Sequence, residues 1–294
     1  MTDLTIGILA GIGCGLNWAI TSFLVRSLLG RMTPVGLTAV RSTVGGGILI
    51  VAAIAAGEGR AMLQAPLWVA LSLWAAILLA MGVGDSLFFP SMKYLGLTRA
   101  LALSLLNPLL TTVTGIVLYN EQMTLARLVG IGLVIGGLGL IVSGRGHDGS
   151  RGAHAIRRGL PLVFLAAVAW ALSATILKPA LRQVPVLAGT ALRIPMAGLV
   201  LWLTPWTRGT LDDVRASTPG ERWRLATICF LNAVGSGLFT LTIRSGGVAV
   251  GNALASTAPL FAIPLEIVIL KQRPSARTVI GAVLTVSGIA CMGF

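Results

Sequence analysis

The chain contains two diverged copies of one sequence, and both copies are almost wholly apolar. At an offset of 152 residues, Trp18 pairs with Trp170, Thr21 with Ser173, Arg26 with Lys178 and Arg41 with Arg193. At an offset of 151 residues, Gly84 pairs with Gly235, Phe88 with Phe239, Lys93 with Arg244, Pro108 with Pro259 and Gly130 with Gly281. A one-residue insertion or deletion between Arg41 and Gly84 accounts for the change of offset. A tandem repeat of hydrophobic segments is typical of many secondary transporters.

The composition places much of the chain in lipid. Hydrophobic residues make up 55% of the 294 residues and charged residues only 11%, too few for the surface of a soluble domain of this length. The net charge of +13 does not indicate nucleic-acid binding, because the cations lie in short gaps between apolar runs. The three cysteines lie far apart within apolar runs, with neither disulfide nor metal-ligand spacing.

The apolar runs predict an all-α integral membrane protein with ten transmembrane helices, because each run has about the 20 residues that a spanning helix needs. The expected spans are 4–25, 34–56, 67–92, 99–119, 125–144, 158–178, 184–204, 222–243, 248–270 and 275–294. The first five-helix repeat covers residues 1–144, a basic linker 145–157, and the second repeat 158–294. Since five is an odd number, the second repeat enters the membrane from the opposite side, and the two repeats are inverted.

The loop charges predict the orientation. The gaps after the first, third, fifth, seventh and ninth spans contain 15 lysine and arginine residues, and the other gaps contain 5. The positive-inside rule therefore places the first set, including the linker, in the cytoplasm and both termini outside. The first apolar run lacks a basic region before it and a cleavage site after it, so we expect a retained helix.

Several short motifs, repeated in order and spacing, resemble EamA-type members of the drug/metabolite transporter superfamily. The first copy contains Asn17-Trp18-Ala19, Arg41, the run 104–109 and the run 121–124 followed by Gly130. The second copy contains Ala169-Trp170-Ala171, Arg193, Ala258-Pro259-Leu260 and the run 272–275 followed by Gly281. The resemblance covers essentially the whole chain.

The resemblance implies a central cavity between the copies, alternating access, and export of a small metabolite, amino acid or drug. The expected location is a bacterial cytoplasmic (inner) membrane, and the expected assembly is a monomer or homodimer. Three alternatives remain open: a flippase subunit for a lipid-linked sugar or phospholipid, a membrane scaffold that transports nothing, and a membrane enzyme, which the missing site chemistry favours least. A cavity lined from both copies favours transport over a scaffold.

Paired prolines mark the expected transport site. Pro108 and Pro259 fall at equivalent positions near the middle of the fourth and ninth spans, where each proline frees a backbone carbonyl. Such paired helix breaks indicate a binding site, although a packing kink is the alternative. The residues expected to contact the substrate are Asn17, Trp18, Phe88, Ser104, Asn107, Trp170, Ser236, Asn252 and Ser256. Helix-to-helix packing is the alternative role for the polar members of this set, and core packing at the interface between the copies is the alternative for Trp18 and Trp170.

Charged residues within the spans are costly and therefore informative. Asp85 is the only acid in its span, and its counterpart is Ser236, so Asp85 is the candidate for proton coupling. A structural ion pair with Arg41 or Arg193 is the alternative. Glu266 lies near the end of the ninth span, and we expect it to extend toward Lys271. Arg41 and Arg193 are expected to be structural, with a substrate-carboxylate contact as the alternative.

The sequence contains no constellation for catalysis. Both histidines, His147 and His154, lie in the linker, so no histidine is available within the membrane as a base or metal ligand. No glycine-rich phosphate loop occurs either. The sequence therefore predicts a protein that is not an enzyme and that uses no cofactor or metal.

Overall fold

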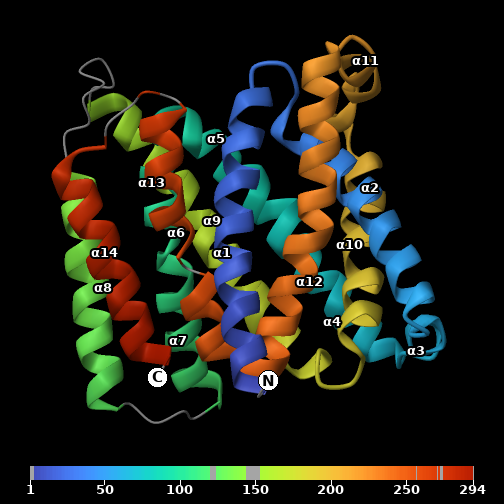
Figure 1. Cartoon of the computed structure of the whole chain (residues 1–294), viewed down its shortest axis with the longest axis horizontal. Coiled ribbons are helices and arrows are strands. Elements are labelled where there is room, and N and C mark those ends of the chain that lie inside the picture. Colours follow the sequence, from blue (N-terminus) through green and yellow to red (C-terminus); the bar gives the residue numbers. More distant parts are fainter. Residues whose placement is uncertain are drawn as a thin grey trace.

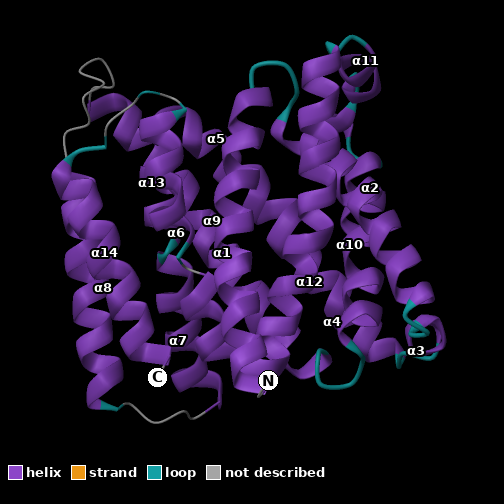
Figure 2. Ribbon diagram, in the orientation of Figure 1, coloured by secondary structure: helices purple, strands orange, loops and turns teal. Residues whose placement is uncertain are grey.

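The computed structural model describes residues 3–119, 124–143, 153–255, 257–269, 271 and 274–293, and in this part helices joined by loops are the only secondary structure (Figures 1 and 2). The first copy forms α1 (Asp3–Leu28), α2 (Pro34–Ala55), α3 (Gly59–Leu63), α4 (Leu67–Ile77), the π-helix η1 (Leu78–Asp85), α5 (Ser86–Leu95), α6 (Leu97–Ser104), α7 (Leu106–Tyr119) and α8 (Leu125–Ser143). The second copy forms α9 (Ala153–Ala180), α10 (Val186–Trp202), the 3₁₀ turn η2 (Pro205–Thr207), α11 (Thr210–Arg215), α12 (Pro219–Ala255), α13 (Ala258–Val268) and α14 (Ala276–Gly293).

Several of these helices are long and apolar enough to cross a membrane. Among the described residues, five such helices occur, at Thr5–Leu28, Pro34–Ala55, Leu67–Leu95, Ile156–Leu177 and Pro219–Ser245. A sixth results if α10 and the sharply bent segment after it count as one span. The other four expected spans correspond to shorter or broken helices. Large apolar side chains such as Leu9, Val51 and Leu128 point outward, as lipid-facing residues do.

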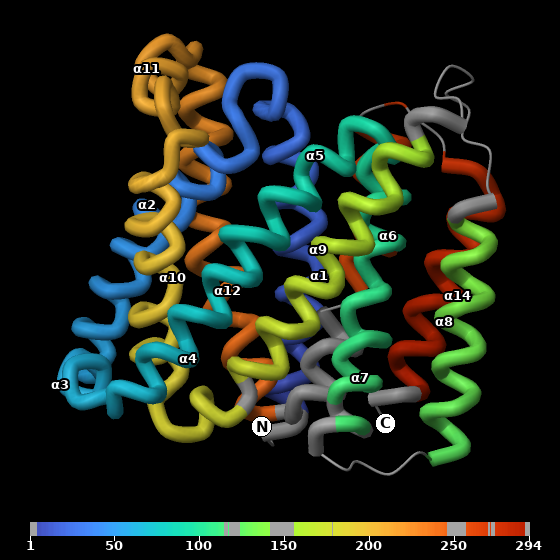
Figure 3. Tube along the Cα trace, turned by 180° about the vertical axis from the view of Figure 1, so that it is seen from behind, coloured from blue at the N-terminus to red at the C-terminus, as the bar shows by residue number. Residues whose placement is uncertain are grey.

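Equivalent helices of the two copies run in opposite directions. α1 begins at the lower edge of Figure 1, whereas α9 begins at the upper edge and descends; Figure 3 shows the same from behind. We call the face where α8 ends and α9 begins the linker face, and the face where α1 begins and α14 ends the terminal face. α1 packs along α12, and the segment α4–η1–α5 packs along α9. The first helix of each copy thus contacts the third helix of the other.

The last helices of the two copies, α8 and α14, pack against each other, and the repeat relates the close contacts on one helix to those on the other. A Cβ atom at Gly281 would lie 2.6 Å from the carbonyl oxygen of Gly137, and one at Gly288 would lie 2.6 Å from that of Gly130. The offset of 151 residues converts one of these pairs into the other. Glycine is needed here because the two backbones touch, and close backbone contact stabilises helix pairs in lipid.

One predicted boundary was wrong. The sequence predicts a gap at residues 244–247 between the eighth and ninth spans, but helical backbone continues through these residues to the end of α12. Arg244 does not require a loop, because its guanidinium donates a hydrogen bond to the carbonyl oxygen of Val184, 3.1 Å away. Glycines at 246 and 247 weaken a helix without ending it.

Glu266 is also placed differently from the prediction, because it does not extend toward Lys271. Its carboxylate is buried and accepts hydrogen bonds from the backbone N–H groups of Leu97 and Thr98, at 2.9 and 3.0 Å. The Thr98 hydroxyl donates a third bond at 2.6 Å, and Arg26 forms an ion pair at 3.4 Å. The first N–H groups of a helix have no partner within that helix, so a carboxylate of α13 satisfies those of α6.

We expect Glu266→Ala to lower the free energy of unfolding by about 2–4 kcal/mol, because the buried N–H and hydroxyl donors of Leu97 and Thr98 lose their acceptor and the ion pair with Arg26 is removed. Glu266→Gln keeps one acceptor oxygen and should lose less than half of that amount. Denaturant titration in mixed micelles measures both values. The matched control is Asp212→Ala, which removes an exposed acid paired with Arg215 and should change little. Equal stability of Glu266→Ala and the wild type would contradict this role.

Candidate functional site

A cavity of about 190 Å³ lies between the two copies. Its walls come from α1, α2, α4, η1, α5, α6 and α7 of the first copy and from α9, α10, α12 and α13 of the second. The polar, charged and aromatic lining residues are Asn17, Trp18, Thr21, Ser22, Arg41, Asp85, Phe88, Phe89, Ser104, Asn107, Trp170, Ser173, Arg193, Asn232, Ser236 and Phe239. A pocket of this kind, mostly apolar with a few convergent polar groups, suits a small solute.

Two aromatic pairs line the cavity. The ring centroids of Phe88 and Trp170 lie 5.0 Å apart, and those of Trp18 and Phe239 lie 5.4 Å apart. Each pair joins the first helix of one copy to the third helix of the other. Because Trp18 matches Trp170 and Phe239 matches Phe88, the repeat relates one pair to the other. Tilted aromatic pairs offer broad apolar surfaces with a polar N–H group.

The extra residue of the first copy falls within the π-helix. Buried positions match at an offset of 152 up to the end of α4, where Leu73, Ala76 and Ile77 correspond to Leu225, Ile228 and Cys229. They match at 151 from the end of η1, where buried Gly84 and Asp85 correspond to Gly235 and Ser236. A π-turn accommodates one more residue than an α-turn and is frequent at functional sites. The inserted residue that changes the repeat offset thus belongs to a segment of the cavity wall.

Side chains of α9 bind carbonyl groups at this irregular segment. The Trp170 Nε1–H donates to the carbonyl oxygen of Ala80 at 3.0 Å, and the Ser173 hydroxyl donates to that of Ala76 at 2.6 Å. Gly84 has no side chain to obstruct this contact, since a Cβ atom there would collide with the Trp170 indole. The π-helix therefore fixes the orientation of Trp170. Trp18 packs against Phe239 of α12, which is an α-helix without a π-turn. Among the described residues, the Trp18 Nε1–H group has no carbonyl partner equivalent to Ala80.

Asp85 forms a buried ion pair with Arg41 of α2. The Arg41 guanidinium also lies over the Phe89 ring, 5.0 Å from its centroid, and Asn232 donates to the Arg41 carbonyl oxygen at 3.1 Å. Of the two roles considered for Asp85, the structural pair is therefore present, and the partner is Arg41. Proton coupling through Asp85 remains a proposal.

Both expected helix breaks lie beside the cavity. Leu105 separates α6 from α7, and Pro108 is the third residue of α7. In the second copy, α12 ends at Ala255 and α13 begins at Ala258, and Pro259 is the second residue of α13. Both prolines thus lie in the first turn of a helix, where their missing N–H costs nothing. Both prolines line the cavity.

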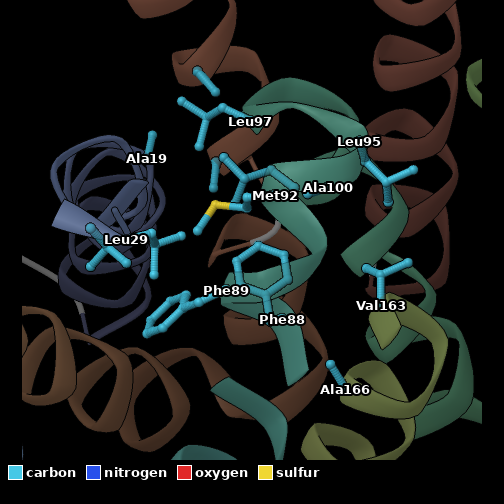
Figure 4. Packing of buried hydrophobic residues seen from close by; sticks show 14 of the residues in the cluster. Ala19, Leu29, Phe88, Phe89, Met92, Leu95, Leu97, Ala100, Val163 and Ala166 are labelled. Atoms are coloured by element: carbon cyan, nitrogen blue, oxygen red, sulfur yellow. The ribbon is translucent and has the colours of Figure 1, made fainter. Parts of the chain in front are cut away.

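A cluster of buried apolar side chains lies between the cavity and the linker face. One to two turns beyond Thr21 and Ser22, α1 contributes the buried side chains of Val25, Leu28 and Leu29. Phe88, Phe89, Met92, Leu97 and Ala100 pack into the same cluster (Figure 4). The contacts of Glu266 with Arg26 and Thr98 lie on this side too. Trp18 and Asn107 remain partly exposed.

Most of the predicted site residues come together here. Asn17, Trp18, Asp85, Phe88, Ser104, Asn107, Trp170 and Ser236 line the cavity with both prolines. Asn252 lies on α12, but its side chain is outside the described part, as is the whole of Ser256. Sequence reasoning missed Asn232, although an amide in an apolar span was the signal used for Asn107. It also missed Phe89, whose contact with Arg41 joins two distant segments.

The model of the EamA-like transporter family matches the chain twice, over residues 5–143 and again over residues 157–294. The two matches together cover nearly the whole chain. The chain belongs to the EamA-like transporter family. It is therefore a multi-pass integral membrane protein and a transporter of the drug/metabolite type, and members of this family are transporters rather than enzymes.

A solved structure, titled only as the crystal structure of a protein, superposes on this EamA-family chain with a TM-score of 0.69. The match covers 98% of this chain and 95% of the other, at 21% sequence identity. At this identity the likeness concerns the fold alone. No curated protein matches the chain.

Proposed function

We propose that the chain is a secondary active transporter that exports a small metabolite, amino acid or drug. The observation that carries this proposal is the cavity lined by both copies, with paired aromatic walls and paired helix breaks. Polar groups at its surface, including Asn17, Asn107 and Asn232, suit an oriented solute rather than a packed core. A scaffold would have no need for such a cavity.

Alternating access is the mechanism that we propose. In this proposal the apolar cluster and the contacts of Glu266 close the cavity at the linker face, and the cavity opens to the terminal side. Transport then requires α6 and α13 to separate from α1 at the linker face while the terminal side closes. The two copies are related by inversion, so each closed state uses equivalent helices.

The membrane arrangement that we propose has ten spans in two inverted five-helix repeats. Six of these spans come from the helices that are long and apolar enough to cross a membrane, the bent α10 segment included. The other four spans are formed by the shorter helices α6–α7, α8, α13 and α14. The linker face carries most loop cations and so faces the cytoplasm of a bacterial inner membrane, with both termini outside. Exchange of a proton at Asp85 is one coupling scheme and facilitated diffusion is another. The assembly is a monomer or a homodimer.

Saturable exchange across proteoliposomes tests the proposed function. Vesicles preloaded with unlabelled amino acids or drugs should accumulate a labelled compound of the same kind by counterflow, and protein-free vesicles should not. Movement of a fluorescent phospholipid between leaflets, without solute exchange, would favour the flippase alternative. Absence of both activities over a broad panel would favour a scaffold.

A further inference from the structure

Arg193 is a buried cation without a counter-ion among the described residues. Only 5% of its surface is exposed, it lines the cavity, and its Nε atom has no hydrogen-bond partner. The other charged groups of the described lining are Arg41 and Asp85, which form a pair with each other. The described cavity wall therefore carries one net positive charge.

The repeat shows why Arg193 differs from its counterpart Arg41. The position equivalent to Asp85 is Ser236, and the position equivalent to Phe89 is Thr240, at the same offset of 151 residues. The acid and the ring that neutralise and cover Arg41 are thus replaced by two hydroxyl residues. On α1, the Cys14 thiol donates a hydrogen bond to the carbonyl oxygen of Gly235, 3.7 Å away, and supplies no carboxylate. Among the described residues, the second copy thus supplies no carboxylate to Arg193 in the way that Asp85 is supplied to Arg41.

An unpaired charge within a membrane protein is costly, and such charges typically mark substrate or ion pathways. A bound anion would remove that cost through charge-assisted hydrogen bonds, which guanidinium groups form readily with carboxylates. The cavity of about 190 Å³ admits a small molecule rather than a macromolecular segment. The aromatic wall of Trp18 and Phe239 faces the same cavity and suits an apolar body attached to the anionic group.

We propose that Arg193 binds the anionic group of the substrate, and that this substrate is a small organic anion or zwitterion with an apolar body. The inference rests on the proposed transport function and specifies its substrate class. Ser236 stands where the first copy has Asp85, so no protein carboxylate at this position competes with the substrate for Arg193. Trp18 and Phe239 contact the apolar part of the substrate.

Three probes of similar shape and different charge test the substrate class: benzoate, benzamide and benzylamine. The full chain is placed in phosphatidylcholine nanodiscs, and binding is followed by tryptophan fluorescence. We expect benzoate to bind about tenfold or more tightly than benzamide, and benzylamine to bind most weakly. Arg193→Gln should remove the preference for benzoate, Arg193→Lys should keep much of it, and the exposed control Arg208→Gln should leave it unchanged. A preference that survives in Arg193→Gln, or no preference in the wild type, would overturn the proposal.

A second variant avoids the loss of a buried cation. Ser236→Asp supplies Arg193 with the counter-ion that Asp85 supplies to Arg41. We expect this variant to fold, to unfold at a higher temperature than the wild type in the absence of ligand, and to lose benzoate binding about tenfold or more. Unchanged benzoate binding in Ser236→Asp would contradict an anion site at Arg193.

The outcomes separate this inference from the proposed function. Saturable exchange of benzylamine or benzamide, blocked by a cavity variant such as Trp170→Ala, would keep transport and overturn the anion site. Benzoate binding that depends on Arg193, without exchange of any probe across vesicles, would keep the site and contradict transport. Loss of benzoate binding on adding phosphatidylglycerol would assign the site to a lipid headgroup and overturn the small-anion proposal.

Discussion

Asp85→Leu should lower the free energy of unfolding by about 3–5 kcal/mol, because it leaves the buried Arg41 guanidinium without its carboxylate. Arg41 is held by contacts on three elements: Asp85 of η1, the Phe89 ring of α5 and, through its backbone, Asn232 of α12. Movement of the guanidinium to water would therefore disrupt the packing of α2 against the cavity wall. Denaturant titration in mixed micelles measures the change.

The double variant Arg41→Met/Asp85→Leu separates charge from packing. Replacement of both partners by apolar residues removes the unpaired cation, so we expect most of the lost stability to return. A double variant as unstable as Asp85→Leu would show that the pair is not the cause. Asp85→Asn, which keeps the shape, tests the coupling proposal separately. A folded Asp85→Asn protein whose transport keeps the wild-type response to a pH gradient would exclude Asp85 as the proton carrier.

Trp170→Ala should reduce transport roughly 30-fold, since truncating a well-packed aromatic side chain at a binding site costs about 2 kcal/mol. The variant removes one wall of the cavity and the partner of Phe88. It also leaves the Ala80 carbonyl group of the π-helix without its donor. Initial rates of counterflow in proteoliposomes measure the effect at matched protein content.

One further substitution separates the contribution of the Trp170 ring from that of its N–H group, and another serves as a control. Trp170→Phe keeps an aromatic ring and removes the N–H donor, so its rate should fall between those of the wild type and Trp170→Ala. Trp223→Ala removes a tryptophan that is 75% exposed on α12 and should leave the rate unchanged. A Trp170→Ala protein that transports at the wild-type rate would show that this wall does not contact the substrate.

The sequence was informative about the site because the repeat relates its two halves. The duplicated tryptophans and prolines predicted which segments meet, and the apolar runs predicted helices throughout. The change of offset also predicted an inserted residue, but the periodicity of the segment could not place it in a π-helix. That placement required the burial pattern, since only buried positions reveal which residues of α4 and α12 correspond.

Contacts between distant segments were harder to predict. Glu266 was expected to reach the adjacent Lys271, yet the backbone donors that it satisfies belong to Leu97 and Thr98, far away in the chain. Nothing in the spacing of the residues indicates that α6 begins against α13. For the same reason the choice of Arg41 over Arg193 as the partner of Asp85 stayed open in the sequence. The break at Leu105 was predicted only approximately, from the nearby Pro108.

Side-specific labelling of a cysteine at Ser104 tests most directly whether the cavity is an alternating-access site. Ser104 lines the cavity and is partly exposed, and the native cysteines are first replaced by alanine. In the resting protein, a membrane-impermeant thiol reagent should label Ser104→Cys from the terminal side and not from the linker side. Adding Glu266→Gln, which weakens the closed linker face, should permit labelling from that side as well. Equal labelling from both sides without Glu266→Gln, or none from either side, would contradict a cavity that opens alternately to the two sides of the membrane.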